Sequence, residues 1–173
     1  MSSLGRVSLR EWREADIPCL TALRNDQKLQ ALLLTRVRGS DAVQVRQWLR
    51  ERTAGPDSLF FVVVEIPLDQ CIGYIQIVGI DWVDSRGDLG ICIGPAQQGQ
   101  GLGTQALRVA IDALRDTWGL RKLSLRVRSD NLKAIRCYER LGFGHCGVQR
   151  RHIRLGGSWH DVSTMELVLD DRA

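Results

Sequence analysis

The chain has 173 residues and a net charge of +4; 44% of its residues are hydrophobic and 25% are charged. This length and balance are ordinary for one globular domain with a sizeable core, so we expect a single domain over residues 1–173. A membrane span is excluded, because no apolar run approaches the roughly 20 residues that one needs. The N-terminal residues also lack the apolar core of a secretion signal, which predicts a cytoplasmic protein.

The basic, cysteine and histidine residues exclude further classes. The 24 basic residues are scattered and have no aromatic residues interleaved with them, which argues against a nucleic-acid partner. The five cysteines form no C-x-x-C pair and mostly lie in apolar stretches, so we interpret them as small buried hydrophobic residues in a reducing compartment. The three histidines lack metal-ligand spacing, and no metal site is expected.

The N-terminal part of the chain predicts a strand followed by helices. Residues 6–12 alternate apolar and polar side chains, as in a half-buried strand. Asp16 is predicted to cap the following helix, and helical sequence resumes over residues 27–35. Asp41 and Gln44 have the spacing of a capping box and predict one more helix, with Trp48 and Leu49 on its buried face.

Three apolar strands follow and are predicted to form an antiparallel meander. They lie at residues 59–65, 71–80 and 88–93, and turn sequences at residues 67–70 and 84–87 separate them. The third strand enters a glycine-rich stretch, and the helix after it carries apolar residues at helical spacing. Those residues are Leu102, Ala106, Val109, Ala110 and Ala113.

The rest of the chain predicts a crossover and a terminal hairpin. A strand at residues 123–127 follows the glycine-rich helix, and a strand–helix–strand unit of this kind makes its two strands parallel. Ser129 or Asp130 is predicted to cap the next helix, which Gly142 closes in a left-handed conformation. Residues 143–169 are predicted to form a hairpin around a two-glycine turn.

The glycine-rich stretch, QGQGLGT at residues 98–104, is a candidate phosphate-binding loop. Glycines at the start of a helix let backbone N–H groups approach a bulky anion, and the helix dipole favours negative charge there. A Walker A loop is excluded because Leu102 follows Gly101. A dinucleotide fingerprint is excluded because Thr104 stands where its third glycine should be. The spacing that fits is Gln-x-x-Gly-x-Gly, and a plain tight turn is the alternative.

A second motif follows the strand at residues 123–127. Residues 131–143 read NLKAIRCYERLGF, which matches Asn-x-x-Ala-x-x-x-Tyr-x-x-x-Gly-Phe. With both motifs in this order, the chain resembles the GNAT family of N-acetyltransferases over residues 6–169. The resemblance implies an α/β (α+β) fold in which about four helices flank a mixed, mostly antiparallel sheet. That sheet would have six to seven strands, including one splayed parallel pair.

The resemblance also implies acetyl-CoA as the cosubstrate, with no metal. Backbone N–H groups of the loop would cradle its pyrophosphate, and the Thr104 hydroxyl would add a donor. The implied loop residues are Gln98, Gly99, Gln100, Gly101, Leu102, Gly103 and Thr104. In the strand before the loop, backbone groups of Ile91, Cys92 and Ile93 would pair with the pantetheine arm, and one N–H there would polarise the thioester.

The second motif would add contacts to the cofactor. Asn131 would bond the pantetheine or stabilise the loop, and the alternative is a helix cap. Lys133 and Arg136 would contact the CoA phosphates, and the alternative is that both remain solvated surface residues.

Two residues carry the predicted chemistry. Tyr138 matches the family's tyrosine that protonates the departing CoA sulfur, while packing of its ring is the alternative. Asp88 is the candidate base that accepts the amine proton, directly or through water, although it is also a plausible turn residue. This branch of the family often has Glu there, and Asp is one methylene shorter. Glu65 is the second candidate base.

Residues 73–88 and 157–161 resemble the branch that acetylates polyamines, amino sugars and ribosomal-protein N-termini. We therefore predict direct transfer of acetyl to a primary amine of a small molecule such as a polyamine or amino sugar. Asp81, Asp84 and Asp88 would suit a cationic acceptor. The alternatives are a protein N-terminal acetyltransferase and a non-catalytic acyl-CoA-binding module. No membrane or nucleic-acid partner is expected, and a homodimer is left open as the assembly.

Overall fold

The computed structural model describes residues 5–37 and 39–169. These residues form seven strands and five α-helices, and a short 3-10 turn precedes both α1 and α4. In chain order the elements are β1 (Val7–Arg10), α1 (Ile17–Asn25), α2 (Gln27–Leu32), α3 (Ala42–Thr53), β2 (Leu59–Glu65), β3 (Gln70–Asp81), β4 (Arg86–Ile93), α4 (Leu102–Asp116), β5 (Lys122–Arg128), α5 (Leu132–Arg140), β6 (Gly144–Leu155) and β7 (Ser158–Val168).

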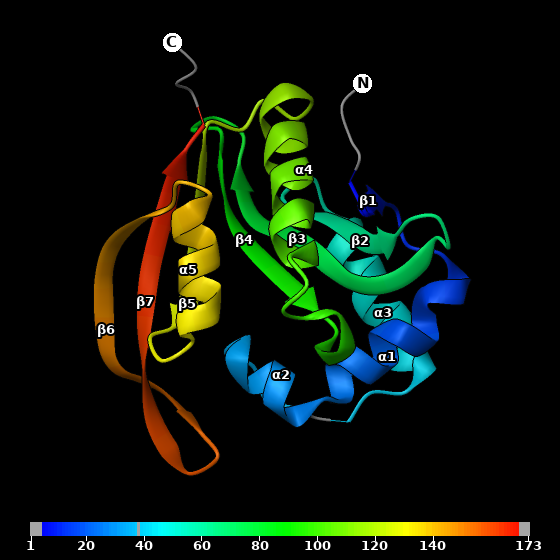
Figure 1. The fold of residues 1–173 in the computed structure, drawn as a ribbon, viewed down its shortest axis with the longest axis horizontal. Helices are drawn as coiled ribbons and strands as arrows, with labels where there is room; N and C mark the ends of the chain where they lie inside the picture. The colour runs from blue at the N-terminus through cyan, green and yellow to red at the C-terminus, as the bar shows by residue number, and fades with distance from the viewer. Residues whose placement is uncertain (1–4, 38, 170–173) are drawn as a thin grey trace.

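All seven strands belong to one sheet in the order β1-β2-β3-β4-β5-β7-β6 (Figure 1). β4 and β5 are parallel, and the other neighbouring strands are antiparallel. α4 connects β4 to β5, as the crossover of a parallel pair requires. The predicted fold class is confirmed. The helix count is five because the segment between β1 and β2 forms three separate helices.

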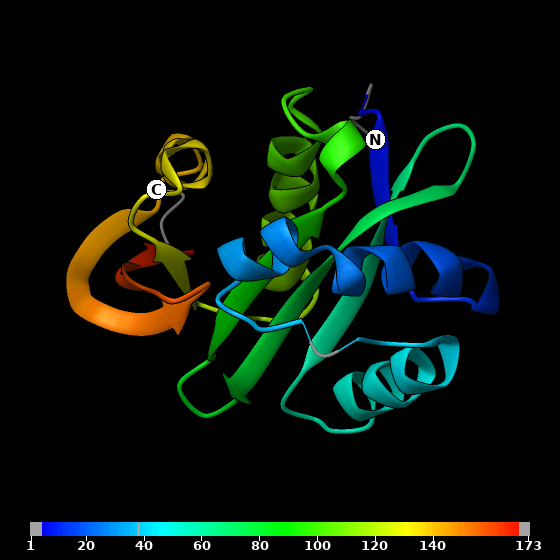
Figure 2. The same cartoon turned by 90° about the horizontal axis from the view of Figure 1, so that it is seen from below.

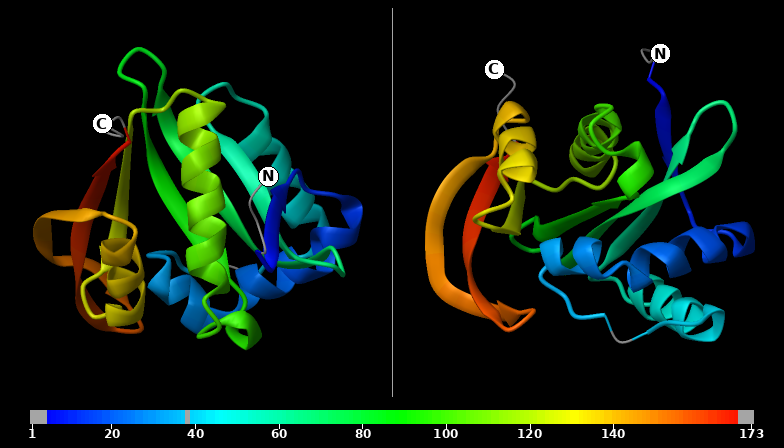
Figure 3. Two further views of the ribbon diagram at one scale, coloured as in Figure 1. Left: turned by 45° about the horizontal axis from the view of Figure 1, so that its top comes forward. Right: turned by 60° about the horizontal axis from the view of Figure 1, so that its bottom comes forward.

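The helices cover the sheet in two layers (Figure 2). α1, α2 and α3 lie on one face, which we call the α1 face; α4 and α5 lie on the other, the α4 face. Two buried clusters follow the same division. One joins α4 and α5 to the sheet, and the other joins α1 and α3 to it. Figure 3 shows the β6–β7 hairpin extending beyond α5 at one edge of the sheet.

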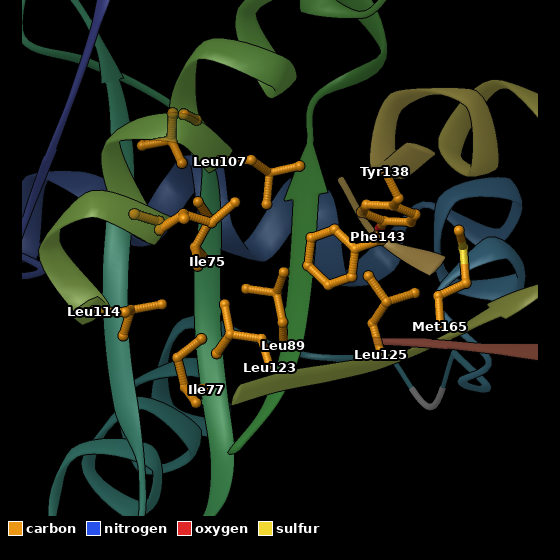
Figure 4. Packing of buried hydrophobic residues seen from close by; sticks show 14 of the residues in the cluster. Ile75, Ile77, Leu89, Leu107, Leu114, Leu123, Leu125, Tyr138, Phe143 and Met165 are labelled. Atoms are coloured by element: carbon orange, nitrogen blue, oxygen red, sulfur yellow. The ribbon is translucent and has the colours of Figure 1, made fainter. Parts of the chain in front are cut away.

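The larger cluster fills the α4 face (Figure 4). Leu107 and Leu114 of α4 are almost fully buried against Ile75, Ile77 and Leu123 of the strands. Burial of one such side chain contributes about 1.5–3 kcal/mol to stability. This packing fixes the position of α4 on β4 and β5, and with it the position of the glycine loop at the start of α4.

The buried face of α4 differs from the prediction at one residue. Val109 is 38% exposed, whereas Leu107 and Ile111 are buried. The helix turns 100° per residue, so the Val109 side chain points away from the buried row that includes Ala106 and Ala110. The prediction for Val109 is therefore wrong, and the other four residues face inward or lie at the edge of the buried row.

The smaller cluster, on the α1 face, has an aromatic centre. Trp48 of α3 packs edge-on against Phe60 and Tyr74, with ring centroids 5.2 and 5.4 Å away. Leu49 is fully buried, as predicted. The predicted capping box of α3 is also confirmed, because Asp41 accepts a bond from the Gln44 N–H at 2.8 Å and the Gln44 side chain bonds back.

Of the two predicted helix caps, one is confirmed in position, since Asp16 is the N-cap residue of α1, and the other, at α5, is wrong. Asp16 precedes α1, but its carboxylate makes no cap bond. It accepts hydrogen bonds from Arg10 and from the Arg13 N–H instead, at 2.8 and 2.7 Å. At α5 the cap is Asn131. In both cases the carboxylate also pairs with an arginine side chain, Asp16 with Arg10 and Asp130 with Arg128, and such hydrogen bonds are charge-assisted.

The two residues predicted to cap α5 have other partners. The Ser129 hydroxyl pairs with Ser163 at 2.8 Å. Asp130 accepts two hydrogen bonds from Arg128, and this guanidinium holds the pKa of the carboxyl below its usual value.

The cysteines fit the prediction only in part. Cys92 is buried, and Cys19, Cys71 and Cys137 are half-buried. Cys146 is exposed because it lies on β6, the edge strand, of which all but the last few residues are exposed. All five thiols are free.

Candidate active site

The parallel pair of strands separates after a short start. Its ladder joins Arg86 to Lys122, Gly87 to Leu123 and Asp88 to Ser124. Within the described chain no strand pairs with the β5 side of β4 beyond Asp88, and Figure 1 shows the two strands diverging there. Neighbouring residues of an antiparallel strand direct their backbone groups to opposite edges, and the Gly94 N–H bonds the Ile72 carbonyl of β3. The predicted Cys92 groups therefore face β3, which contradicts that part of the prediction. The Ile91 groups and the Ile93 N–H face the open edge and are available to an extended ligand, while the Ile93 carbonyl accepts from Gln98.

The glycine loop lies where β4 leads into α4. Gly99 and Gly101 have φ angles of 79° and 77°, which other residues rarely adopt. A side chain built at either glycine would meet nothing within 4 Å, so the loop presents bare backbone to open space. Gly101 directly precedes α4, so the first free N–H groups of that helix belong to the same loop. These features fit a bulky anion such as a pyrophosphate.

Hydrogen bonds from polar side chains stabilise the glycine loop. Gln98 donates to the Ile93 carbonyl at 2.9 Å, and Gln100 donates to the Ala96 carbonyl at 3.0 Å. The Thr104 hydroxyl lies 3.1 Å from the Cys137 thiol, which connects α4 to α5. Gln98, Gln100 and Thr104 therefore stabilise the loop and its link to α5 through their side chains, and the Gln98 N–H also bonds the Pro95 carbonyl.

Tyr138 lies on α5 with its ring against Phe143, at 5.7 Å between centroids (Figure 4). Burial raises the pKa of the phenol well above its ordinary value. Among the described residues the Tyr138 hydroxyl has no hydrogen-bond partner, and its oxygen is not fully enclosed by the protein. Tyr138 thus packs in the core and also keeps a protonated hydroxyl that can donate.

Asp88 lies within β4, at the last rung before β4 and β5 separate. The turn before it is formed by residues 82–85, so Asp88 is not the turn residue that the alternative required. Neighbouring strand residues point to opposite faces. Since Leu89 belongs to the cluster of the α4 face and Cys92 to that of the α1 face, the Asp88 side chain lies on the α1 face.

Comparison with known proteins identifies the family. Residues 6–144 match the family described as Acetyltransferase (GNAT) domain. This match covers most of the chain.

The chain is an acetyltransferase domain of the GNAT family.

Its relatives differ in how much of the chain they match. The spermidine N(1)-acetyltransferase of Escherichia coli (strain K12) is 34% identical over 93 residues, which are 54% of this chain and 50% of that protein. The chain thus spans half the length of this relative. The L-methionine sulfoximine/L-methionine sulfone acetyltransferase of Pseudomonas aeruginosa is 27% identical over 171 residues, 95% of both chains.

A solved structure confirms the GNAT fold. The crystal structure of spermidine N-acetyltransferase from Vibrio cholerae in complex with CoA and spermine superposes with a TM-score of 0.88 at 21% identity. The superposition covers 95% of this chain and 96% of that one.

The remaining motif residues of this GNAT domain lie on α5. Asn131 is its N-cap and accepts a long hydrogen bond, 3.4 Å, from the Ala134 N–H. The predicted alternative for Asn131, a helix cap, is thus present in the structure. Lys133 and Arg136 are exposed, on the helix that borders the splayed strands. Their predicted contacts with the CoA phosphates stay predictions.

Three other acidic residues are engaged elsewhere. Glu65 forms an ion pair with Arg6 at 2.6 Å, at the β1–β2 side of the sheet and away from the splayed strands. Asp81 accepts from two backbone N–H groups of the turn after it, which lowers the pKa of its carboxyl, and it also pairs with Arg86. Asp84 pairs with the same arginine at 3.5 Å. Of the three aspartates predicted to suit a cationic acceptor, only Asp88 lies at the strand separation without such a partner.

The structure adds two residues that sequence reasoning missed, Gln76 and Arg126. Gln76 pairs with Gly90 across β3 and β4, and Arg126 lies two residues beyond Ser124 on β5. Neither residue stands in a motif. Only the strand register, which no local sequence signal defines, brings them to the strand separation.

Two expected absences can be checked for part of the chain. Among the described residues, no three His, Cys, Asp or Glu side chains gather as a metal site would require. In the same part of the chain, no helix is long and apolar enough to cross a membrane.

Proposed function

We propose that this domain is an acetyl-CoA-dependent N-acetyltransferase that transfers acetyl directly to the primary amine of a small molecule. The observation that carries the proposal is the splayed β4–β5 pair, which opens directly beside the glycine loop. The loop takes the pyrophosphate, and the unpaired edge of β4 takes the pantetheine arm. The acetyl group then lies near the point where the strands separate.

The proposed chemistry assigns a role to each of two residues. Bound acetyl-CoA supplies a thioester, whose carbonyl carbon the amine nitrogen attacks while the C–S bond breaks. Asp88 takes the proton that the amine gives up, directly or through water. Tyr138 donates its proton to the departing sulfur, and its raised pKa keeps that proton in place until the sulfur becomes basic.

The two relatives named above favour small acceptors. One acts on a polyamine by its name, and the other acts on amino-acid derivatives. The second is aligned over nearly the whole chain, including the segments that form the α1 face. We therefore place amines of both kinds in the first test, and keep protein N-termini as the alternative acceptor. A cytoplasmic location and a homodimer stay predictions.

Thiol release from acetyl-CoA tests the proposal. The assay follows free CoA with a thiol reagent while the protein is mixed with spermidine, glucosamine, α-amino acids or a short peptide with a free N-terminus. Turnover with a small amine and product N-acetylation by mass spectrometry are expected. Saturable acetyl-CoA binding without turnover on any amine would instead support the non-catalytic module, and turnover on the peptide alone would support the protein N-terminal enzyme.

A further inference from the structure

One row of residues crosses the sheet at the strand separation. Gln76 of β3 pairs with Gly90 of β4, and Arg126 of β5 pairs with Thr164 of β7. Because Asp88 pairs with Ser124 two residues earlier on each strand, Gly90 and Arg126 would be opposite each other had the two strands stayed together. The strand separation therefore lies between Gln76 on one side and Arg126 on the other.

The Arg126 side chain lies on the α1 face, like that of Asp88. Leu125 and Val127, its neighbours in β5, belong to the cluster of the α4 face, so alternation directs Arg126 to the other side. The α4 face at this level is occupied by α4, α5 and the proposed cofactor. An acceptor amine consequently approaches from the α1 face, where Asp88 and Arg126 lie on opposite sides of the gap.

Arg126 is unlike the other basic residues on this face of β5. Lys122 forms an ion pair with Glu166, and Arg128 forms one with Asp130. Arg126 has no hydrogen bond or ion pair with any residue that the structure describes. Its neighbour across the ladder, Thr164, carries no charge. A guanidinium with five N–H donors thus remains available for an anion at the mouth of the gap.

Gln76 of β3 offers a hydrogen-bond acceptor, which complements the donors of Arg126. Its side-chain oxygen is enclosed and has no hydrogen-bond partner among the residues at 5–37 and 39–169. The Gln76 amide lies over Gly90, close enough that a Cβ on Gly90 would come within 3.2 Å of its nitrogen. A buried carbonyl oxygen without a donor carries a cost of about 1–3 kcal/mol that a bound N–H group would relieve. An amine that enters the gap becomes such a donor once the Gln76 amide turns its oxygen towards it.

We propose that the acceptor carries a carboxylate next to its primary amine, as an α-amino acid does, and that Arg126 binds this carboxylate. Asp88 and the Gln76 oxygen face the ammonium group, and Arg126 forms paired hydrogen bonds with the carboxylate oxygens. The inference rests on the proposed function and specifies its substrate class. A polyamine fits this arrangement less well, because its second ammonium group would meet an unpaired guanidinium.

The test compares acceptors that differ only in the carboxylate. Each α-amino acid is paired with the amine that has the same side chain, for example L-leucine with 3-methylbutylamine, and spermidine is included. Initial rates of thiol release give kcat/KM for each pair, and calorimetry on the protein saturated with CoA gives acceptor affinity without turnover. The parent protein is expected to favour the amino acid about 10- to 100-fold, the range for hydrogen bonds between charged groups.

Variants of β5 assign the preference to one residue. Arg126→Gln should abolish the preference for the amino acid while leaving acetyl-CoA affinity unchanged, and Arg126→Glu should reverse it towards spermidine. Arg128→Gln is the matched control, since Arg128 lies on the same strand and face but is neutralised by Asp130. Its preference should equal that of the parent.

Three outcomes would overturn the inference, and they differ from failure of the proposed function. Equal kcat/KM and affinity for the two members of every pair would show that no carboxylate is bound. A preference that survives in Arg126→Gln would assign it to another residue. A loss of acetyl-CoA affinity in Arg126→Gln would make Arg126 a cofactor contact. In all three cases amine turnover persists. If the proposed function itself is wrong, no amine is turned over and no acceptor binds to the complex of the protein with CoA.

Discussion

The two faces of the splayed strand pair are built in different ways. On the α4 face, the glycine loop and the second motif are continuous stretches, and each brings its own backbone conformation and its own helix start. On the α1 face, Gln76, Asp88 and Arg126 come from three strands, and each is a single residue without a motif around it. The proposed cofactor binding thus depends mainly on local backbone geometry, whereas the proposed acceptor recognition depends on strand register. Substitutions on the two faces should therefore fail in different assays.

The largest effect is expected at the glycine loop. Gly101→Val should weaken acetyl-CoA binding by about 1,000-fold, because a branched side chain fills the open space and cannot easily adopt a φ of 77°. Calorimetry with acetyl-CoA measures this loss. Gly119→Val is the matched control, since Gly119 has a φ of 67° and equally open surroundings at the other end of α4. Equal affinities in the two variants would show that the loop does not bind the cofactor.

The next effect concerns the proton donor on α5. Tyr138→Phe should lower kcat about 100-fold, within the usual range for a general acid, with little change in acetyl-CoA affinity. Because burial raises the pKa of Tyr138, its donor stays protonated, and kcat should show no alkaline loss from this group below about pH 10. Steady-state rates across pH measure both effects.

The chain provides a control for this prediction. Its other tyrosine, Tyr74, is also buried with a raised pKa, but it stacks on Phe60 within the cluster of the α1 face. Tyr74→Phe should leave kcat within about twofold of the parent while removing a similar hydroxyl. Parent-like kcat in Tyr138→Phe would leave water or another group to protonate the thiolate.

A smaller, pH-dependent effect is expected at Asp88. Asp88→Asn should reduce kcat/KM for the amine about 10-fold near pH 6, where free amine is scarce, and progressively less as the pH rises. Acetyl-CoA affinity should not change. The pH–rate profiles of parent and variant measure the difference, with Asp84→Asn as control because Asp84 pairs with Arg86 in the turn. Superimposable profiles would leave Asp88 without a role as base.

The smallest effect tests whether Asn131 acts as a cap. Asn131→Ala should lower the free energy of unfolding by about 1 kcal/mol, since it removes the cap of α5, while Asn131→Asp keeps a side-chain acceptor and should retain stability. Denaturant unfolding measures both. A fall in acetyl-CoA affinity in Asn131→Asp with stability kept would show that the Asn131 side-chain N–H donates to the cofactor. Unchanged affinity would show that Asn131 acts only as the helix cap.

Much of the fold was predictable because its signals are local. Alternating apolar residues predicted β2 to the residue, and the capping box of α3 is as expected. The side-chain bonds at the starts of α1 and α5 were predicted only in part. Asp16 is the N-cap residue of α1 but pairs with Arg10, and Asp130 pairs with Arg128 while Asn131, given as an alternative, caps α5. Those ion pairs depend on where each arginine lies along its strand and on which way it points.

The sequence by itself determined the parts of the site that depend on short-range backbone conformation. Glycines at the start of α4 predict a phosphate-binding loop, and the spacing from Asn131 to Tyr138 places the tyrosine two turns along α5. Tertiary structure alone decided where β4 and β5 separate and which residues meet there. The side-chain period of a strand is two, so a shift of one residue in register would move Arg126 and Asp88 to the other face. Packing of the helices on both faces of the sheet sets that register. The register in turn decides on which face the charged side chains of Asp88 and Arg126 lie.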